Sequence, residues 1–272
     1  MNKTTNNPID YRTAEIRDLA ESISLEYFPT GLVKPEWIAR ENRITYSYGH
    51  YDEAFDGLLQ YRHGKWHIFL NLTRNPDSTS PRMRYTFCHE FGHYFIDEHR
   101  NAIRAGKVKE HPSFNSLNPR NRAEQEADYF ASCLLMPGKK VKEFCHRKPM
   151  SSKLIVDIGK HFQTSTSAAI YKYMELSLFP MLMVMSRDGK VEWKRMTDGF
   201  KYWCAPKSGM PVPVNSAAGE YFSKGKQYKT EEIVFADDWF TDQYRVKDEQ
   251  FWELCYYLPG NKVMSLIWKK EK

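Results

Sequence analysis

The chain has 272 residues, of which 41% are hydrophobic and 27% charged, and its mean hydropathy is −0.67. This composition is typical of a folded globular protein and excludes the collagen-like and intrinsically disordered classes. No apolar stretch is long enough to span a membrane, and no apolar signal segment is found near the start, so we expect a cytoplasmic protein with no membrane partner.

The formal net charge is +6, and residues 100–150, with 11 basic and 5 acidic residues, account for the whole excess. A basic segment of this kind can attract nucleic acid, but a solvated loop rich in Lys and Arg is the more common explanation. The five cysteines are widely spaced and form no C-x-x-C pair, which favours reduced, buried thiols.

The N-terminal part of the chain predicts two helices followed by a small sheet. Apolar residues recur at helical spacing over 10–27, and Pro35 is a favourable first residue for a short second helix. Residues 44–48 and 57–72 are rich in β-branched and aromatic side chains, with a tight turn at 63–64. We expect these residues to form a small antiparallel sheet.

Two longer helices follow, separated by a loop. Apolar residues recur every four positions within 82–99, which predicts a continuous helix. Residues 100–120 contain two X-Pro pairs and little periodicity, whereas 121–136 are helical in pattern and end at a Pro-Gly pair.

The remaining chain changes in character near residue 181. Residues 151–162 and 166–177 have the outline of a helix-turn-helix, but Lys172 is the only cation of the second helix. Because phosphate contacts supply most non-specific affinity for DNA, we favour a packing or substrate-docking role over DNA binding. Two hairpin patterns in 181–272 predict a β-rich domain, whose many Trp and Tyr residues favour an aromatic core over a ligand pocket.

The sequence His89-Glu90-Phe91-Gly92-His93 matches the H-E-x-x-H pattern and lies inside the predicted helix 82–99. Residues four apart on a helix share a face and lie about 6 Å apart, so His89 and His93 can bind one Zn²⁺. Glu90 then stands beside the open coordination position, and we expect it to act as general base.

A catalytic zinc site needs a third protein ligand, and two residues compete for this place. His99 has the spacing of the pattern H-E-x-x-H-x-x-G-x-x-H, but Ile96 replaces the glycine at which that chain bends. On an unbroken helix, six residues turn by about 240°, which would direct His99 away from the metal.

The favoured candidate is Glu124, on the helix predicted over 121–136. Asp128 lies one turn further on the same face, where it can accept the free imidazole N–H of a ligand histidine. This pair resembles the gluzincin arrangement. Glu126 points elsewhere on such a helix, and we expect it to be solvated or paired with a cation.

Two blocks of the sequence together resemble the ImmA/IrrE family of metallopeptidases: residues 84–93, which contain the H-E-x-x-H pattern, and 124–137, which contain Glu124 and Asp128. The chain departs from the family pattern at Cys88, where alanine is usual, and at Asp128, where asparagine is usual. Either residue at 128 can accept from an imidazole N–H. The resemblance covers residues 10–180.

The resemblance implies a cytoplasmic, zinc-dependent endopeptidase that acts in a stress response and cleaves a specific protein, expected to be a helix-turn-helix transcriptional repressor. One Zn²⁺ per chain is expected, although two histidines and a glutamate also accept Mn²⁺. The ion would activate a water and polarise the peptide carbonyl. His111 is one candidate for the donor that stabilises the oxyanion, although a surface histidine is the more common explanation.

These observations predict an α+β fold: a helical metallopeptidase domain with a small sheet at 1–148, a helix-turn-helix-like segment at 149–180, and a β-rich regulatory or substrate-recognition domain at 181–272. The alternative function is a metal-stabilised module that binds protein or DNA without proteolysis. Glu90 would have no purpose in such a module, and structural zinc sites usually have four protein ligands. A metzincin-type broad-specificity protease is disfavoured by Ile96.

Overall fold

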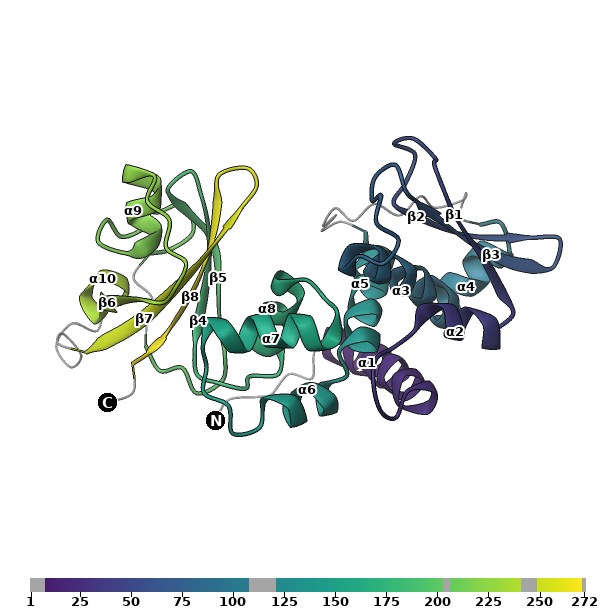
Figure 1. Cartoon of the computed structure of the whole chain (residues 1–272), viewed down its shortest axis with the longest axis horizontal. Helices are drawn as coiled ribbons and strands as arrows, with labels where there is room; N and C mark the ends of the chain where they lie inside the picture. The colour runs from purple at the N-terminus through teal and green to yellow at the C-terminus, as the bar shows by residue number, and fades with distance from the viewer. Residues whose placement is uncertain (1–7, 108–120, 203–205, 241–248, 271–272) are drawn as a thin grey trace. The chain divides into compact units, whose positions relative to one another are not determined.

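The computed structural model describes residues 8–107, 121–202, 206–240 and 249–270. The chain forms two compact units: residues 1–144 with 157–172, and residues 145–156 with 173–272. The α+β class expected from the sequence is confirmed, since helices and a three-stranded sheet build the first unit and a five-stranded sheet the second (Figure 1).

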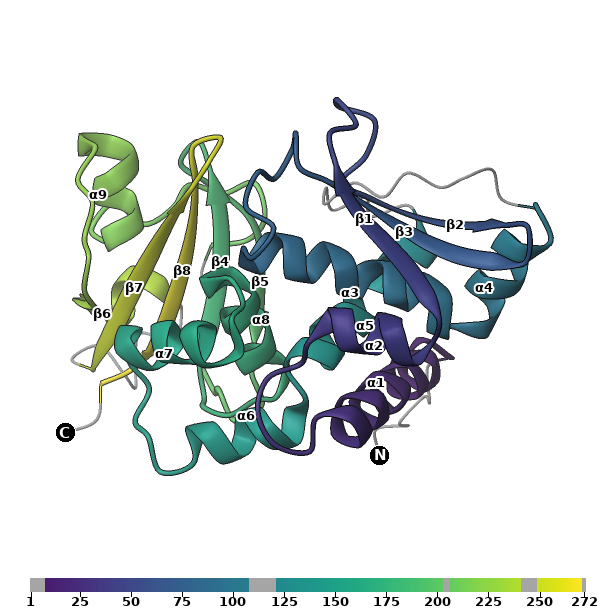
Figure 2. The same cartoon turned by 45° about the vertical axis from the view of Figure 1, so that its right-hand side comes forward.

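The first unit contains α1 (Pro8–Tyr27), α2 (Pro35–Glu41), β1 (Ile44–Gly49), β2 (Gly57–Arg62), β3 (Lys65–Asn71), α3 (Pro81–Phe95), α4 (Asp97–Arg104) and α5 (Arg122–Leu135). Helices α6 (Gly138–Cys145), α7 (Ser152–Phe162) and α8 (Thr166–Glu175) contribute residues to both units. The sheet packs on α3, α3 on α5, and α5 on α1 (Figure 2). Helix α3 therefore lies buried between the sheet and α5.

The sheet has the order β1-β3-β2 and is mixed. Strands β2 and β3 form the expected antiparallel hairpin, whose turn residues His63 and Gly64 have φ values of 50° and 77°. Both positive values suit the tight turns that match the twist of a hairpin. Strand β1, however, pairs with β3 in parallel, so the expectation of a wholly antiparallel sheet is wrong. Strand β3 lies between the other two, and this pairing across the chain is not encoded in the local pattern of either strand.

Helix α3 begins at a strong cap, because the Ser80 side chain accepts a hydrogen bond from the backbone of Met83. It ends at Phe95, and the prediction of one unbroken helix over 82–99 is wrong. Ile96 is extended and 2% exposed, and the chain starts again as α4 with acidic residues in its first turn. Burial of the Ile96 side chain and favourable charge at the new N-terminus explain the break.

The helix-turn-helix outline is present in α7 and α8. Gly159 of α7 lies close to the turn, because a Cβ there would stand 3.2 Å from the Thr164 carbonyl oxygen. Lys172, the one cation of α8, is 1% exposed and donates to the Cys133 sulfur. Its ammonium is therefore not available to a DNA phosphate. Among the helices that the structure describes, none has both the length and the apolar character needed to cross a bilayer.

The second unit is built on an antiparallel sheet of order β5-β4-β8-β7-β6. Its remaining elements are β4 (Leu182–Arg187), β5 (Lys190–Met196), α9 (Ala217–Lys224), β6 (Glu232–Phe235), α10 (Ala236–Trp239), β7 (Gln250–Leu258) and β8 (Lys262–Lys269). Both hairpins expected after residue 181 are confirmed, at 188–189 and 260–261.

Aromatic side chains fill the core of this second unit, in line with the expected aromatic core. Trp239, Phe240 and Phe251 are each at most 1% exposed and belong to one cluster. A fully buried carboxylate, Glu253, accepts hydrogen bonds from the backbone N–H groups of Ala217 and Ala218 and from the Trp239 indole. These charge-assisted bonds fasten the start of α9 and the aromatic cluster to β7.

Candidate metal centre

His89 and His93 lie one turn apart on α3 and are buried, with exposures of 2% and 5%. Their Nε2 atoms are 3.1 Å apart and point to a common position. The four-residue spacing thus places both imidazoles as the sequence predicts.

Glu124, in the first turn of α5, completes a cluster of three donor side chains. Its carboxylate oxygens lie 3.2 Å from His89 Nε2 and 3.2 Å from His93 Nε2. Ligands that share one tetrahedral ion with bonds of about 2.0–2.1 Å are themselves about 3.3 Å apart. The donor set and its spacing therefore fit a single Zn²⁺ ion.

Asp128 lies one turn after Glu124 and contacts His89 from the other side of its ring. The Asp128 carboxylate lies 2.9 Å from His89 Nδ1 and accepts a 2.8 Å hydrogen bond from the Tyr85 hydroxyl. With Nδ1–H donating to Asp128, the Nε2 lone pair of His89 faces the cluster. Tyr85 was not predicted, although its position four residues before His89 places it on the same helix face.

The electrostatics of the cluster favour a cation. Burial alone lowers the pKa of His89, but hydrogen bonds to the Asp128 and Glu124 carboxylates outweigh it and raise the pKa to about 10. For Glu124, burial raises the pKa, whereas hydrogen bonds from the two imidazoles outweigh this and hold the pKa well below its usual range. The raised pKa of His89 and the lowered pKa of Glu124 both indicate that positive charge is stabilised between these side chains.

Glu90 stands next to His89 on α3 and is fully buried. Gly57, the first residue of β2, lies directly against it, because a Cβ on Gly57 would be 2.6 Å from Glu90 Oε1. The preceding residue, Asp56, is held by Arg74 at 2.8 Å and by Arg82 at 3.3 Å. This ion-pair group fixes the start of β2 over α3. The role of Gly57 was not predicted, since the contact joins residues 33 positions apart.

The two helices that carry the donors cross at very short range. A Cβ on Gly92 would lie 2.7 Å from the Ala127 Cα atom, so only glycine fits at this point of α3. The contact lies one turn from His89 and one turn from Glu124. The small side chains at 92 and 127 therefore set the distance between the histidine pair and the glutamate.

His99 and Glu126 form a separate group beside the centre. His99 Nε2 lies 3.1 Å from Glu126, which also binds Arg12 at 3.0 Å and Arg122 at 2.8 Å. Glu126 is thus paired with cations, as predicted. The expectation that His99 points away from the centre assumed an unbroken helix, and the helix breaks at Ile96. The His99 ring therefore lies close to the His93 ring, with 5.3 Å between the ring centroids. The Nε2 atom of His99 is nevertheless engaged by Glu126. Burial lowers the pKa of His99 to about 4.

Among the described residues, Cys88 is not part of the donor cluster. Cys88 is buried, and burial raises the pKa of its thiol to about 12, so it stays protonated. His111 lies outside the described residues.

The close crossing predicts that Gly92→Ala separates α3 from α5. We expect the substitution to lower stability by about 1–3 kcal/mol through overpacking and to reduce bound metal, measured by thermal unfolding and elemental analysis. Gly159→Ala is the matched control, because its Cβ would come no nearer than 3.2 Å to Thr164 and it lies outside the cluster. Full metal content in Gly92→Ala would contradict this role of the crossing.

The hydrogen bond from His89 predicts different effects for two substitutions of Asp128. Asp128→Ala removes the acceptor and should weaken zinc binding by about 10–100-fold, whereas Asp128→Asn keeps an acceptor oxygen and should retain most of the affinity. Titration against a competing chelator measures both constants. Equal affinity in Asp128→Ala and the unsubstituted chain would show that Asp128 does not orient His89.

Comparison with known proteins places these residues in a family context. Residues 51–174, which contain all five residues predicted for the site, match the model of an M78 peptidase family described as the IrrE N-terminal-like domain. The chain is 23% identical over 203 residues to the radiation response metalloprotease IrrE of Deinococcus radiodurans. That match covers 66% of this chain and spans 57% of the length of the curated relative.

The fold also matches a solved structure. A transcriptional regulator of Mycobacterium tuberculosis superposes with a TM-score of 0.54 at 12% identity, over 94% of this chain and 88% of that one. At this identity the likeness concerns the fold alone. The segment that carries the candidate centre, residues 51–174, is thus similar to the IrrE N-terminal-like domain of M78 peptidases.

Proposed function

We propose that the chain is a metal-dependent endopeptidase in which His89, His93 and Glu124 bind one Zn²⁺ ion. Mn²⁺ is the alternative ion for these donors. The observation that carries the proposal is the convergence of three buried donor side chains from two helices, at separations of 3.1–3.2 Å, beside a buried fourth residue, Glu90.

The chemistry follows from the positions of the side chains. When bound, the ion supplies a Lewis acid that polarises a peptide carbonyl and makes a water nucleophilic at neutral pH. Glu90 takes the proton from the attacking water and later delivers it to the leaving amine. Gly57 leaves the space that the Glu90 carboxylate occupies, while Asp128 and Tyr85 keep His89 in the orientation that binds the ion.

A pocket beside the centre supports a polypeptide substrate. It has a volume of about 530 Å³ and adjoins Asp128 and Tyr85, and its wall continues to the turn between α7 and α8. The apolar part of the pocket lining comes from Leu135, Met136 and Ala168. The lining also includes Ser132 and Ser167. We assign to this pocket a side chain of the bound substrate next to the cleaved bond.

We further propose that the substrate is a helix-turn-helix transcriptional repressor, cut in the cytoplasm during a stress response. Support comes from the similarity to the IrrE N-terminal-like domain and from the Deinococcus relative, which is a radiation response metalloprotease. DNA binding by the chain itself is less favoured, because Lys172 of α8 is buried. The division into 1–148, 149–180 and 181–272, with a regulatory or substrate-recognition role for the last part, stays a proposal.

The function predicts distinct effects for substitutions at two acidic residues. Elemental analysis should find about one metal ion per chain in the unsubstituted protein and in Glu90→Gln, and almost none in Glu124→Ala, which lacks one of three ligands. His99→Ala is the control and should keep its metal. Full metal content in Glu124→Ala would remove Glu124 from the ligand set.

Proteolysis is then measured on the same proteins. New N-termini are labelled in a cell lysate after incubation with each metal-loaded variant, and Glu90→Gln should lower their rate of formation by about 10²–10⁴-fold. Helix-turn-helix repressors should be prominent among the cleaved proteins. Full metal content without any new termini would instead favour the non-proteolytic, metal-stabilised binding module.

A further inference from the structure

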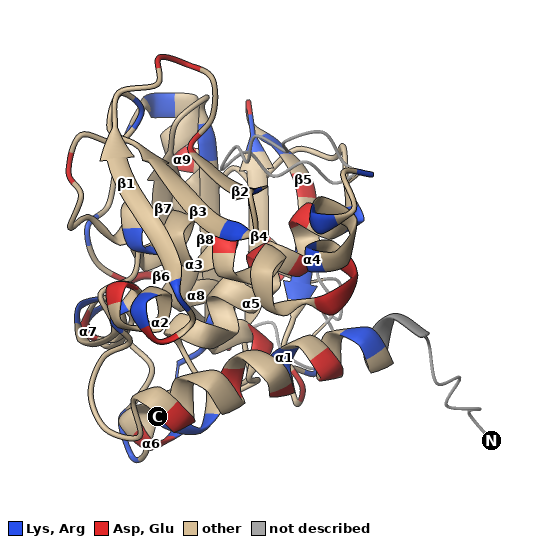
Figure 3. Cartoon of the chain, turned by 90° about the vertical axis from the view of Figure 1, so that its right-hand side faces the viewer, with Lys and Arg blue, Asp and Glu red and all other residues tan. Residues whose placement is uncertain are grey.

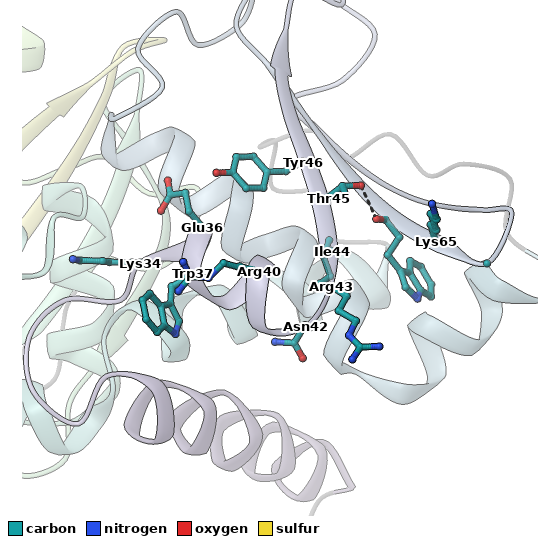
Figure 4. A pocket seen from close by; sticks show the side chains of 12 residues that line it. Lys34, Glu36, Trp37, Arg40, Asn42, Arg43, Ile44, Thr45, Tyr46 and Lys65 are labelled. Atoms are coloured by element: carbon teal, nitrogen blue, oxygen red, sulfur yellow. Dashed lines mark hydrogen bonds between the residues drawn. The ribbon is translucent and has the colours of Figure 1, made fainter.

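A second large groove lies on the first unit, formed by α2, β1 and the start of β3. Its volume is about 1010 Å³, and all its lining residues come from 34–46 and 64–66, whereas the metal centre is built from α3 and α5 (Figure 4). Trp37 and Tyr46 line the groove and are 44% and 37% exposed. Large apolar side chains thus face solvent at a hollow of the surface.

Four cations line the same groove: Lys34, Arg40, Arg43 and Lys65. The lining includes one carboxylate, Glu36, which accepts a hydrogen bond from the Tyr48 hydroxyl. Residues 1–99 as a whole hold 11 basic and 14 acidic residues, and Figure 3 shows acidic residues along α1 and at the start of α4. The groove therefore has four cations and one carboxylate in its lining, although acidic residues are in excess in this part of the chain.

The cations are presented in defined positions. The Arg40 guanidinium lies 4.0 Å above the Trp37 ring, and its Nε atom is 3.5 Å from the Glu41 carboxylate. The ring and the carboxylate hold a long side chain that is still 64% exposed and can be reached by a ligand. Arg43 has a φ of 55°, and this left-handed residue turns the chain from α2 directly into β1. Glycine would adopt that conformation with less strain, so an arginine here carries a backbone cost.

Strand β1 adds a second mode of recognition. It is an edge strand, because the described sheet has the order β1-β3-β2 and β1 pairs with β3 on one side. Such a strand directs half of its backbone N–H and C=O groups outward, where they can pair with an added strand. Thr45 and Tyr46, in the part of β1 that lines the groove, are exposed.

We propose that the groove binds an extended, acidic polypeptide segment, which adds to β1 as a further strand. Carboxylates of the segment meet Arg40, Arg43 and Lys65, and its apolar side chains contact Trp37 and Tyr46. Backbone pairing supplies affinity in this mode of binding, and side-chain contacts supply specificity. A nucleic acid has the complementary charge but cannot pair with a strand edge, and Glu36 would face its phosphates.

The test uses fluorescence anisotropy with two labelled eight-residue peptides of alternating sequence, one of Glu and Val and one of Lys and Val. The acidic peptide should bind saturably and at least about tenfold more tightly than the basic one, because charge complementarity selects between them. Equal binding of both peptides, or no binding of the acidic one, would overturn the proposal.

Variants locate the binding site. Replacing both arginines, Arg40→Glu with Arg43→Glu, should weaken binding of the acidic peptide by at least about tenfold. The matched control is Lys139→Glu with Lys142→Glu, which makes the same change of charge on exposed residues of α6 and should leave binding unchanged. Equal losses in the two double variants would mean that net charge, and not the groove, determines binding.

Backbone pairing is tested on the peptide itself. N-methylation at alternate residues removes hydrogen-bond donors without altering charge, and it should abolish most of the binding if the segment pairs with β1. Undiminished binding of the methylated peptide would overturn the strand-addition model. A thymidine oligonucleotide that binds the groove more tightly than the acidic peptide would also overturn it, in favour of a nucleic-acid partner.

Discussion

The candidate metal centre depends on how closely α3 and α5 cross. Gly92 and Ala127 meet where a single added methyl group would collide with the Ala127 Cα atom, and each lies one turn from a donor. Because helix backbones are stiff, this contact sets the separation between the imidazoles of α3 and the carboxylate of α5. The glycine of the H-E-x-x-H segment is thus a packing residue, while its neighbours are the residues proposed to bind the metal and act as base.

Around this crossing, acidic groups are divided between two networks. Asp128 and Tyr85 orient His89 toward the cluster, whereas Glu126, on the opposite side of α5, is taken up by Arg12, Arg122 and His99. Arg12 also binds Glu98 at 2.9 Å, so this second network joins α1, α4 and α5. On α5, Asp128 therefore faces the candidate centre, whereas Glu126 stabilises the packing of the helices.

The local parts of this arrangement could be predicted from the sequence. Helical spacing alone places His89 near His93 and Glu124 near Asp128, and the turn at 63–64 follows from local backbone preferences. The long-range parts could not be predicted in this way. The contact of Gly57 with Glu90, the close approach of Gly92 to Ala127 and the parallel pairing of β1 with β3 all join residues that the sequence pattern does not relate. The break at Ile96 was missed for the same reason, since burial overrode the local helical pattern.

The proposed metal centre is a single ion bound by two imidazoles of α3 and one carboxylate of α5. X-ray absorption spectroscopy of the zinc-loaded protein tests this ligand set directly, because imidazole, carboxylate and thiolate ligands differ in scattering and bond length. We expect two imidazole ligands and oxygen ligands at about 2.0–2.2 Å, with no sulfur. A zinc–sulfur distance of about 2.3 Å, or a third imidazole, would contradict it by assigning a ligand role to a cysteine or to His99.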